Sequence, residues 1–238
     1  MNIAYDLHIH SSLSPCADND MTPNNIVNMS VLKGLDVIAV TDHNSCANVQ
    51  ACAGCAQNAG LLVIPGMEAE TAEEIHAVCL FPDIKSAFLM QELVYSRLPQ
   101  LKNREDIFGE QLVLDQNDQL IRKEEQLLLA AASITINELF HIVNDELHGL
   151  VIPAHIDRQS NSILSVLGVL PPDIDISCVE IGRRNAETQL ADRNPELGPM
   201  KKIYSSDAHQ LGNINERENF LEVEELSARG VIEALRRK

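Results

Sequence analysis

The stretch YDLHIHSSLSPCADND, residues 5–20, places two histidines one residue apart directly after an apolar run. In a β-strand, residues i and i+2 point to the same side, so His8 and His10 would direct two imidazoles at one point. Imidazole is the commonest metal-binding side chain in proteins. The pair alone still favours an ordinary, partly exposed strand edge, so the rest of the chain has to decide between the two interpretations.

The composition suits a chain with one large core. Of the 238 residues, 45% are hydrophobic and 3% are aromatic, with no tryptophan, so packing must rest on Leu, Ile, Val and Ala. This length fits a single large domain, and α/β barrels of this size are usually single. We therefore expect one domain over residues 1–238.

The formal net charge of −17 bears on partners and location. Such a chain repels a nucleic-acid backbone or an anionic bilayer unless cations or a local arginine cluster reverse the field. Polar Asp6, His8 and His10 interrupt the first apolar run, which argues against a signal peptide. No window approaches the ~18 apolar residues that span a membrane. We expect a cytoplasmic protein with six reduced cysteines.

Seven short runs rich in apolar and β-branched residues predict strands. They are NIAYDLHIH (2–10), LDVIAVTDH (35–43), LLVIPGME (61–68), IHAVCLF (75–81), LVIPAH (150–155), SCVEIG (177–182) and IYSSDAH (203–209). Several runs are continuously apolar rather than alternating, which is typical of strands covered on both faces in a parallel α/β architecture. A helix is expected over 22–34, with Thr22 as its N-cap and Pro23 at its first position.

The segment from Pro82 to Gly149 differs in character. SAFLMQELVYSRL (86–98) predicts an amphipathic helix, and residues 108–125 predict a hairpin around Asn117 and Asp118. A capping box from Thr135 to Glu138 begins a further helix that ends at Gly149. We take residues 85–133 as an insertion between the fourth and fifth strands. The C-terminal segment predicts an extended edge followed by a closing helix.

Histidines and acids recur where the predicted strands end. The strand ends carry Asp42-His43, Glu68, His155 and Asp207-x-His209, and in a parallel barrel these ends share the face that holds the active site. His76 begins its strand, but seven residues after Glu68 are too few for a parallel crossover, so this strand should run back antiparallel. Six histidines thereby reach one rim, which favours a metal site. His141 and His148 lie elsewhere and are assigned no chemistry.

With these residues in hand, the chain resembles the PHP (polymerase and histidinol phosphatase) family of metal-dependent phosphoesterases. The resemblance is carried by DLHIHSSLSP (6–15), MTPNNIVNMSVLKGLDVIAVTDHNS (21–45), IPGMEAET (64–71), EIHAVCLF (74–81), GLVIPAH (149–155) and SSDAH (205–209). It implies a distorted seven-stranded (β/α) barrel with up to three metal ions at its mouth.

The resemblance also implies a ligand set. His8, His10 and Asp207 would hold the first metal, and Asp18, His43 and His209 the second; Glu68 would bridge the first metal to a third, completed by His76 and His155. The loop before Thr22 is longer than in the family's short forms. Asp18 keeps the family's four-residue spacing to Thr22, Asp20 is its rival and Cys16 a remote third. Asp42, beside His43, is not expected to bind a metal itself but to orient His43 from behind the ligands.

These ligands suit two or three divalent ions, Zn, Mn or Fe. We expect a phosphoesterase that uses a metal-activated hydroxide, with His8, His10, Asp207 and His209 as its catalytic residues. Arg183, Arg184 and Arg158 follow strand ends and are candidates for contacts with the substrate phosphate, Arg183 first.

The expected partner is a small phosphorylated metabolite or nucleotide; long nucleic acid is disfavoured by charge, and no pattern indicates an oligomeric state. Two alternatives stay open: an amidohydrolase-type enzyme, since His-x-His with a late Asp also resembles that group, and a non-catalytic metal-binding regulatory module.

Overall fold

The computed structural model describes residues 1–237 of the chain. Its ten strands are β1 (Asn2–Ile9), β2 (Val37–Val40), β3 (Leu62–Glu70), β4 (His76–Leu80), β5 (Leu112–Leu114), β6 (Leu120–Lys123), β7 (Leu150–Pro153), β8 (Cys178–Glu180), β9 (Lys201–Ile203) and β10 (Phe220–Glu222). Its α-helices are α1 (Pro23–Leu32), α2 (Val49–Ala56), α3 (Ile84–Arg97), α4 (Glu105–Phe108), α5 (Ile136–Phe140), α6 (Ile163–Leu167), α7 (Glu187–Arg193) and α8 (Ala228–Arg236). A π-helix, η1 (His141–Glu146), continues α5, and three short 3₁₀ turns are η2 (Arg184–Ala186), η3 (Pro195–Leu197) and η4 (Leu211–Asn213).

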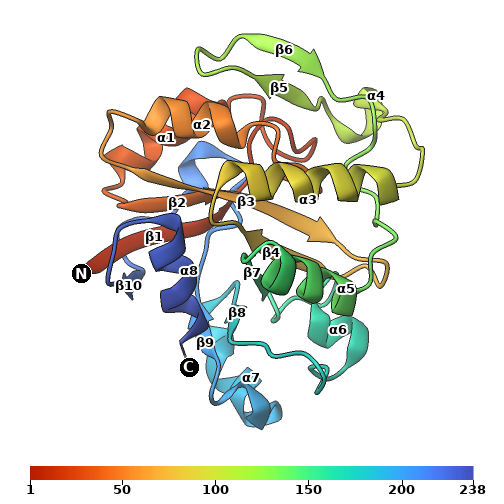
Figure 1. The fold of residues 1–238 in the computed structure, drawn as a ribbon, viewed down its shortest axis with the longest axis vertical. Coiled ribbons are helices and arrows are strands. Elements are labelled where there is room, and N and C mark those ends of the chain that lie inside the picture. The colour runs from red at the N-terminus through yellow and green to blue at the C-terminus, as the bar shows by residue number, and fades with distance from the viewer. Residues whose placement is uncertain (238) are drawn as a thin grey trace.

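Six strands form one mixed sheet in the order β10-β1-β2-β3-β4-β7 (Figure 1). Strands β1, β2 and β3 are parallel, whereas β4 pairs antiparallel with both β3 and β7. The antiparallel direction predicted for the fourth strand is therefore confirmed. It places His76, the first residue of β4, opposite Glu70 near the end of β3.

The predicted sixth and seventh strands differ from expectation. Strands β8 and β9 form a separate parallel pair of three residues each, and β9 ends at Ile203, well before Asp207. Asp207 has φ +51°, a left-handed conformation that a strand cannot contain. Single bonds join β8 and the loop after β9 to the large sheet. The N–H of Ile156, just after β7, donates to the carbonyl of Glu180 on β8, and Ala208 in the loop after β9 forms a bridge with Ile9 of β1. The structure is thus an α/β fold with a six-stranded mixed sheet, and not one continuous ladder of seven strands.

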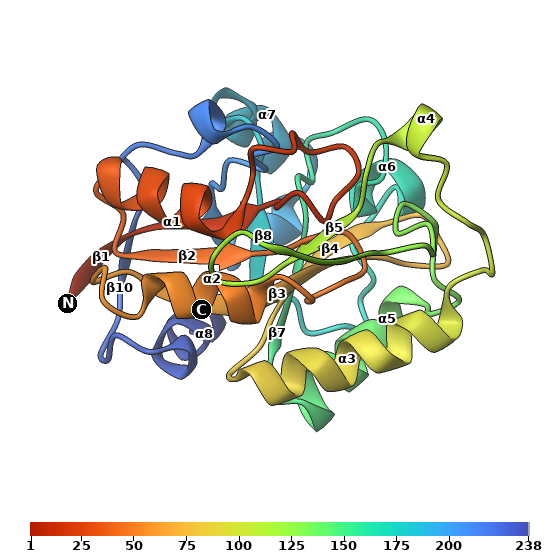
Figure 2. The same ribbon diagram turned by 90° about the horizontal axis from the view of Figure 1, so that it is seen from above.

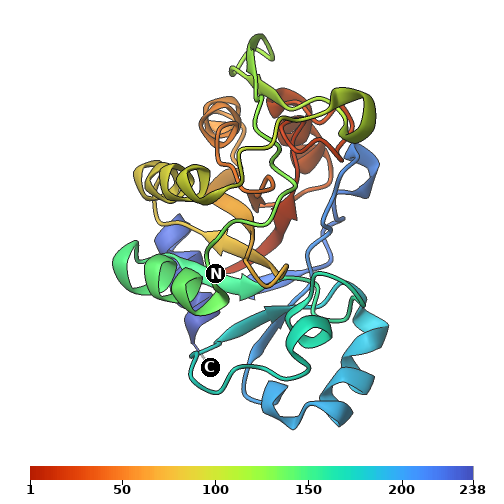
Figure 3. The ribbon, with the colours of Figure 1, turned by 90° about the vertical axis from the view of Figure 1, so that its right-hand side faces the viewer.

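Both faces of the sheet are buried, as the continuous apolar runs predicted. One face contributes Leu7, Ala39, Ile64 and Ile152 to a cluster that α8 completes. The other face packs against α1, α2, α3 and α5. Figure 2 shows α1 beside β1 and β2, with α3 farther along the molecule beside α5, and Figure 3 shows the β5–β6 hairpin and the region of α7 at opposite ends of the molecule.

Local signals correctly placed the starts of two predicted helices. Thr22 caps α1 by accepting the N–H of Asn25, with Pro23 in the first turn. The Thr135–Glu138 capping box is present at the start of α5. The predicted hairpin forms as β5 and β6, and its turn residue Asp118 has φ +58°.

The segment between β4 and α5 is bonded to the loops beside the strand ends. The Asn44 side chain donates to the carbonyls of Leu128 (2.9 Å) and Ala130 (3.0 Å), and the Leu112 N–H donates to the carbonyl of Ser12 (2.9 Å).

Within residues 1–237 no helix is both long and apolar enough to cross a bilayer.

Candidate metal centre

The Glu68 carboxylate, on β3, lies at the centre of a ring of imidazoles and is 1% exposed. Five ring nitrogens lie within 3.4 Å of its oxygens. Beside Oε1 lie Nδ1 of His76 (3.0 Å), Nε2 of His155 (3.2 Å) and Nε2 of His8 (3.4 Å). Beside Oε2 lie Nδ1 of His43 (3.0 Å) and Nε2 of His10 (3.3 Å). Five of the six histidines expected at the rim therefore surround one buried carboxylate.

The ligand atoms form three overlapping groups, in each of which they lie within 4.8 Å of one another. The groups are His8, His10, Glu68 and Asp207; His10, His43 and His209; and His43, Glu68 and His76. His10 belongs to two groups, and so do His43 and Glu68. An arrangement with shared members suits neighbouring cations that share ligands.

Neighbouring strands deliver these side chains to one edge. His10 directly follows β1, and His43 follows β2 and forms a parallel bridge with Glu68. His155 comes two residues after β7, in a left-handed conformation with φ +31°. The arrival of consecutive strand ends at one edge is the reason why residues far apart in the chain converge here.

The imidazole of His10 is oriented by a serine that the sequence analysis did not single out. Ser14 Oγ lies 3.0 Å from His10 Nδ1, donates to Asp42 Oδ1 (2.7 Å) and accepts the N–H of His43 (3.1 Å). Asp42 also accepts the N–H and the hydroxyl of Ser11. Asp42 therefore supports His10 through Ser14, and the same serine accepts the backbone N–H of His43. Among residues 1–237 no hydrogen bond joins Asp42 directly to the His43 ring. The signal for the bond to Ser14 was the serine-rich loop after the second histidine.

A second overlooked residue is Glu180, at the end of β8. Its carboxylate lies 3.0 and 3.1 Å from Nδ1 of His8. Glu180 is an acid at a predicted strand end, so the rule that found Glu68 and Asp207 would also have found it.

The loop that carries Asp207 and His209 is held against β1. The buried Asp6 carboxylate accepts the N–H groups of Ser206 and Asn215, both at 2.9 Å. Asp207 Oδ1 then lies 3.0 Å from His10 Nε2 and 3.3 Å from His8 Nε2. The loop thus reaches the site through hydrogen bonds and not through a strand.

Close packing of these charges shifts their pKa values. Burial opposes protonation of His8, but the carboxylates of Glu180, Asp207 and Glu68 raise its pKa well above the ordinary value. In the same way, and despite burial, Asp207 and Glu68 raise the pKa of His10 to about 9. The histidines around Glu68 hold the pKa of that carboxyl well below its usual range, although burial acts in the opposite direction.

The pKa values of two further imidazoles, those of His43 and His209, are shifted in the opposite direction. Burial lowers the pKa of His43 to about 4, and burial together with the charge on His10 lowers that of His209 to about 4. Neutral imidazoles and ionised carboxylates are the forms that bind metal ions.

The donor atoms fit divalent cations. Glu68 Oε2 and His155 Nδ1 are buried without a hydrogen-bond partner, although imidazole nitrogens lie near the former. The Nε2 atoms of His8 and His10 face each other at 3.2 Å. Buried polar atoms normally find hydrogen-bond partners, so Glu68 Oε2 and His155 Nδ1 indicate that a partner, such as a cation, is missing. Imidazole and carboxylate donors without thiolate suit Zn, Mn or Fe in an open site.

Asp18 lies apart from these groups. Its side chain and that of Asp20 are exposed, and within residues 1–237 neither belongs to any of the three groups. The N–H of Asp18 does donate to the carbonyl of His209 (2.9 Å), which keeps its loop beside the site. The assignment of Asp18 to the second metal stays a prediction.

The three arginines are placed differently from one another. Arg158 forms an ion pair with Asp207 and has a side chain that is 46% exposed. Arg184 stacks over the Tyr204 ring at 4.1 Å and hydrogen-bonds Asn219, so its guanidinium is engaged away from the ligand groups. Arg183 is exposed, and its backbone N–H donates to Asp157 (3.1 Å).

Histidines and carboxylates gathered at the strand ends of an α/β fold are typical of metal-dependent hydrolases, the class expected from the sequence. A family model described as the PHP domain matches residues 6–162. The chain belongs to the PHP domain family.

Relatives and similar structures include nucleases. The chain is 31% identical over 115 residues to 5′-3′ exoribonuclease Rnm of Escherichia coli, a match that covers 46% of this chain and 38% of the relative. The matches to curated relatives span 29–38% of those proteins. The fold is similar to the lesion-specific endonuclease PfuEndoQ from Pyrococcus furiosus, with a TM-score of 0.71, 20% identity, and coverage of 99% of this chain and 56% of that one.

The expectation of a small partner, with nucleic acid disfavoured, is wrong for proteins of this kind. Curated relatives are named exoribonucleases. A structure of endonuclease Q holds a 27-mer duplex with an abasic lesion at the active site. It matches with a TM-score of 0.69 and 19% identity, over 99% of this chain and 56% of that one. Net charge describes the whole surface, whereas cations and nearby arginines set the field at the site itself. An overall charge of −17 therefore does not exclude a nucleic-acid substrate.

Proposed function

We propose that this PHP-family protein is a metal-dependent phosphoesterase that hydrolyses phosphodiester bonds in a nucleic acid. The observation that carries the proposal is the buried carboxylate of Glu68, which has five imidazole nitrogens within 3.4 Å of its oxygens. The nucleases among its relatives and similar structures support the choice of substrate class.

Two or three divalent ions, Zn, Mn or Fe, would occupy the centre. His8, His10 and Asp207 would hold the first, Asp18, His43 and His209 the second, and Glu68, His76 and His155 the third. When bound, such ions lower the pKa of water toward neutrality and neutralise the charge that develops on a phosphoryl oxygen.

The chain's own residues would orient the reacting groups. Ser14 and Glu180 fix the rings of His10 and His8 through their Nδ1 atoms, which leaves the Nε2 atoms facing the pocket. Arg158 is paired with Asp207 through one amino group, so the remainder of its half-exposed guanidinium is free to hold a phosphate. Arg183 would extend this positive edge, and Arg184 would contribute less because Tyr204 and Asn219 engage it.

The proposal extends to the fold. The β8–β9 pair, linked to β7 through Ile156 and to β1 through Ala208, would complete a distorted seven-stranded barrel. Residues 85–133 would then be an insertion in a single domain over residues 1–238, and this insertion would border the site because it bonds to Asn44.

The test is a nuclease assay on metal-free protein resupplied with Mn²⁺, Zn²⁺ or Fe²⁺. Substrates would be single-stranded RNA, single-stranded DNA and an abasic-site duplex, each labelled at the 5′ or the 3′ end. We expect metal-dependent shortening of at least one substrate, abolished by EDTA and restored by the metal. The two label positions distinguish attack from an end from internal cleavage.

A phosphate monoester, an amide and a lactone complete the panel. Turnover of the amide or the lactone without nucleic-acid cleavage would identify an amidohydrolase-type enzyme instead. Metal binding with no turnover of any substrate would favour a regulatory module. Either result would overturn the proposed function.

A further inference from the structure

The Glu180 carboxylate is a buried charge with an unusual set of partners. It is 1% exposed and lies at the end of β8, far in sequence from the strands of the main sheet. Among the described residues no lysine or arginine side chain pairs with it, and its ion-pair partner is His8. Burying a carboxylate is costly unless its hydrogen bonds are satisfied, so the partners that satisfy it carry the argument.

Its first contact sets the chemical form of His8. Both carboxylate oxygens lie 3.0–3.1 Å from His8 Nδ1. Because an ionised carboxylate accepts hydrogen bonds and cannot donate them, Nδ1 carries the proton. The other nitrogen, Nε2, is then directed at the pocket, 3.3 Å from Asp207 Oδ1 and 3.4 Å from Glu68 Oε1.

Its second contact fixes the backbone at His155. Glu180 Oε1 accepts the N–H of His155 (3.1 Å), and the carbonyl of Glu180 accepts the N–H of Ile156 (2.9 Å). His155 has φ +31°, a left-handed conformation that costs energy for a residue other than glycine. Glu180 thus accepts the N–H groups of two consecutive residues, His155 and Ile156. These two bonds stabilise the conformation of His155 and hold its ring 3.2 Å from Glu68.

Glu180 therefore touches candidate ligands from two strands, β1 and β7, that are not neighbours in the sheet. We propose that Glu180 is a positioning residue for the metal centre: it fixes the tautomer of His8 and the backbone of His155, and so sets the cation affinity of the site. Carboxylates that bind the far nitrogen of a ligating imidazole raise its basicity and fix its orientation. The inference rests on the metal centre of the proposed function and not on the identity of the substrate.

The experiment measures cation binding without substrate. Metal-free wild type, Glu180→Gln and Glu180→Ala are titrated with Mn²⁺ by calorimetry, and folding is checked by circular dichroism. We expect the affinity to fall about 10-fold in Glu180→Gln, which keeps an acceptor oxygen but loses the charge, and about 100-fold in Glu180→Ala. An unchanged dissociation constant in a folded variant overturns the proposal; should Glu180→Ala not fold, Glu180→Gln decides alone.

Asp36→Asn is the matched control. The Asp36 carboxylate also accepts a backbone N–H, that of Ala4 on β1 (2.7 Å), but it pairs with Arg217 away from the ligand groups. Its Mn²⁺ affinity should equal that of the wild type, and an equal loss in both positions would show a general effect of charge and overturn the proposal.

A spectroscopic signature separates positioning from a merely structural role. In ¹H–¹⁵N correlation spectra of the zinc-loaded protein, the bond to Glu180 should shift the His8 Nδ1–H proton downfield and slow its exchange with water. Glu180→Gln should move this resonance upfield, and a His8 Nδ1–H resonance that is unchanged in that variant overturns the assignment. Because cation binding is read without substrate, a protein that binds Mn²⁺ but cleaves no nucleic acid rejects the proposed function and leaves this inference intact.

Discussion

Two regions of the molecule bring histidine next to carboxylate, with different results. At the metal centre, His43 Nδ1 lies 3.0 Å from Glu68, and the side chains are 8% and 1% exposed. In the groove between the π-helix η1 and residues 173–175, His141 Nδ1 lies 2.9 Å from Asp145, and the side chains are 65% and 69% exposed. The two pairs have nearly equal distances and opposite burial.

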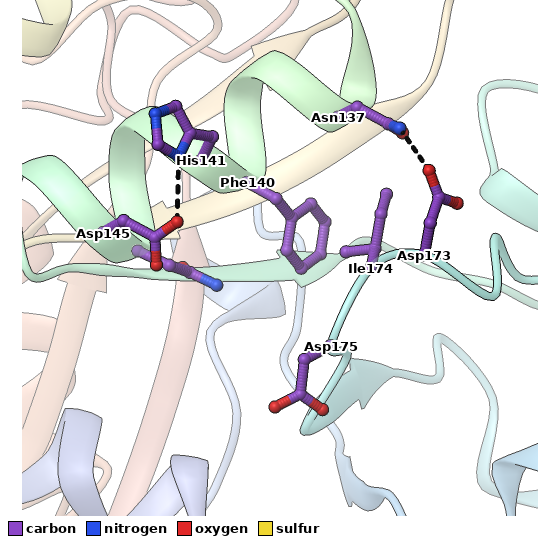
Figure 4. Close-up of a pocket in the computed structure, with 8 residues that line it drawn as sticks. Asn137, Phe140, His141, Asp145, Asp173, Ile174 and Asp175 are labelled. Atoms are coloured by element: carbon purple, nitrogen blue, oxygen red, sulfur yellow. Dashed lines mark hydrogen bonds and ion pairs between the residues drawn. The ribbon is translucent and has the colours of Figure 1, made fainter.

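The carboxylates of the groove also do not point toward a common centre (Figure 4). The groove encloses a cavity of about 440 Å³ lined by Asp145, Asp173 and Asp175, among other residues. Figure 4 shows these carboxylates spread around the cavity, with Asp173 bonded to Asn137 and Asp145 bonded to His141. Within residues 1–237 the groove contributes no group of three ligand atoms close enough to share a cation.

Residue type and pair distance therefore do not by themselves identify a metal site. An exposed pair is stabilised little because water competes for both partners. Buried charges persist when they are paired or bind metal. Five imidazoles around one buried carboxylate, together with a buried His155 Nδ1 that has no hydrogen-bond partner, indicate the second case. Substitutions at the metal centre and in the groove test this distinction.

The largest effect is expected from Glu68→Gln. This change removes the charge that two ligand groups share, so cleavage should fall by about 1000-fold or more and Mn²⁺ binding should weaken with it. Cleavage rates on whichever nucleic acid the wild type cleaves, and equilibrium dialysis of Mn²⁺, measure the two effects.

Glu222→Gln is the control for that variant. It removes an exposed carboxylate from β10 and changes the net charge equally. A Glu68→Gln protein that is folded and cleaves as fast as Glu222→Gln would refute the central place given to Glu68.

An intermediate effect is expected from Ser14→Ala. The Ser14 hydroxyl donates to Asp42 and faces His10 Nδ1, so its loss frees the ring and leaves the buried Asp42 oxygen with one bond fewer. We expect Mn²⁺ affinity to fall about 10-fold, measured by calorimetry.

Ser12→Ala provides the comparison within the same loop. Ser12 is equally buried, but its hydroxyl has no hydrogen-bond partner. Its removal should leave the affinity at the wild-type value, and equal losses in both variants would mean that the loop responds to packing rather than to the bond with His10.

The smallest effect is expected in the groove. His141→Ala and Asp145→Asn break an exposed pair, so the free energy of unfolding should change by no more than about 0.5 kcal/mol. Activity and Mn²⁺ binding should stay at wild-type values. Urea unfolding and the cleavage assay check this, and a loss of metal from either variant would assign the groove to the site.

Much of the site could be predicted because strand ends meet at a common edge. The short gap between Glu68 and His76 correctly predicted an antiparallel β4, since seven residues cannot cross over a sheet. The prediction was less successful where loops decide. The strand expected to include Asp207 stops at Ile203. Asp42, expected to orient His43, instead accepts a hydrogen bond from the Ser14 hydroxyl, which lies beside His10.

The sequence by itself determined the strand runs, the helix caps, the buried character of both sheet faces, and the histidines and acids available at the strand ends. These depend on periodicity and on near neighbours in the chain, which a sequence displays directly. The tertiary structure alone decided that Glu68 is the common neighbour of five imidazoles, that Glu180 supports His8 and His155, and that the Asp18 side chain is exposed. Such contacts join residues up to 172 positions apart, and their distances follow from how strands and loops pack in space.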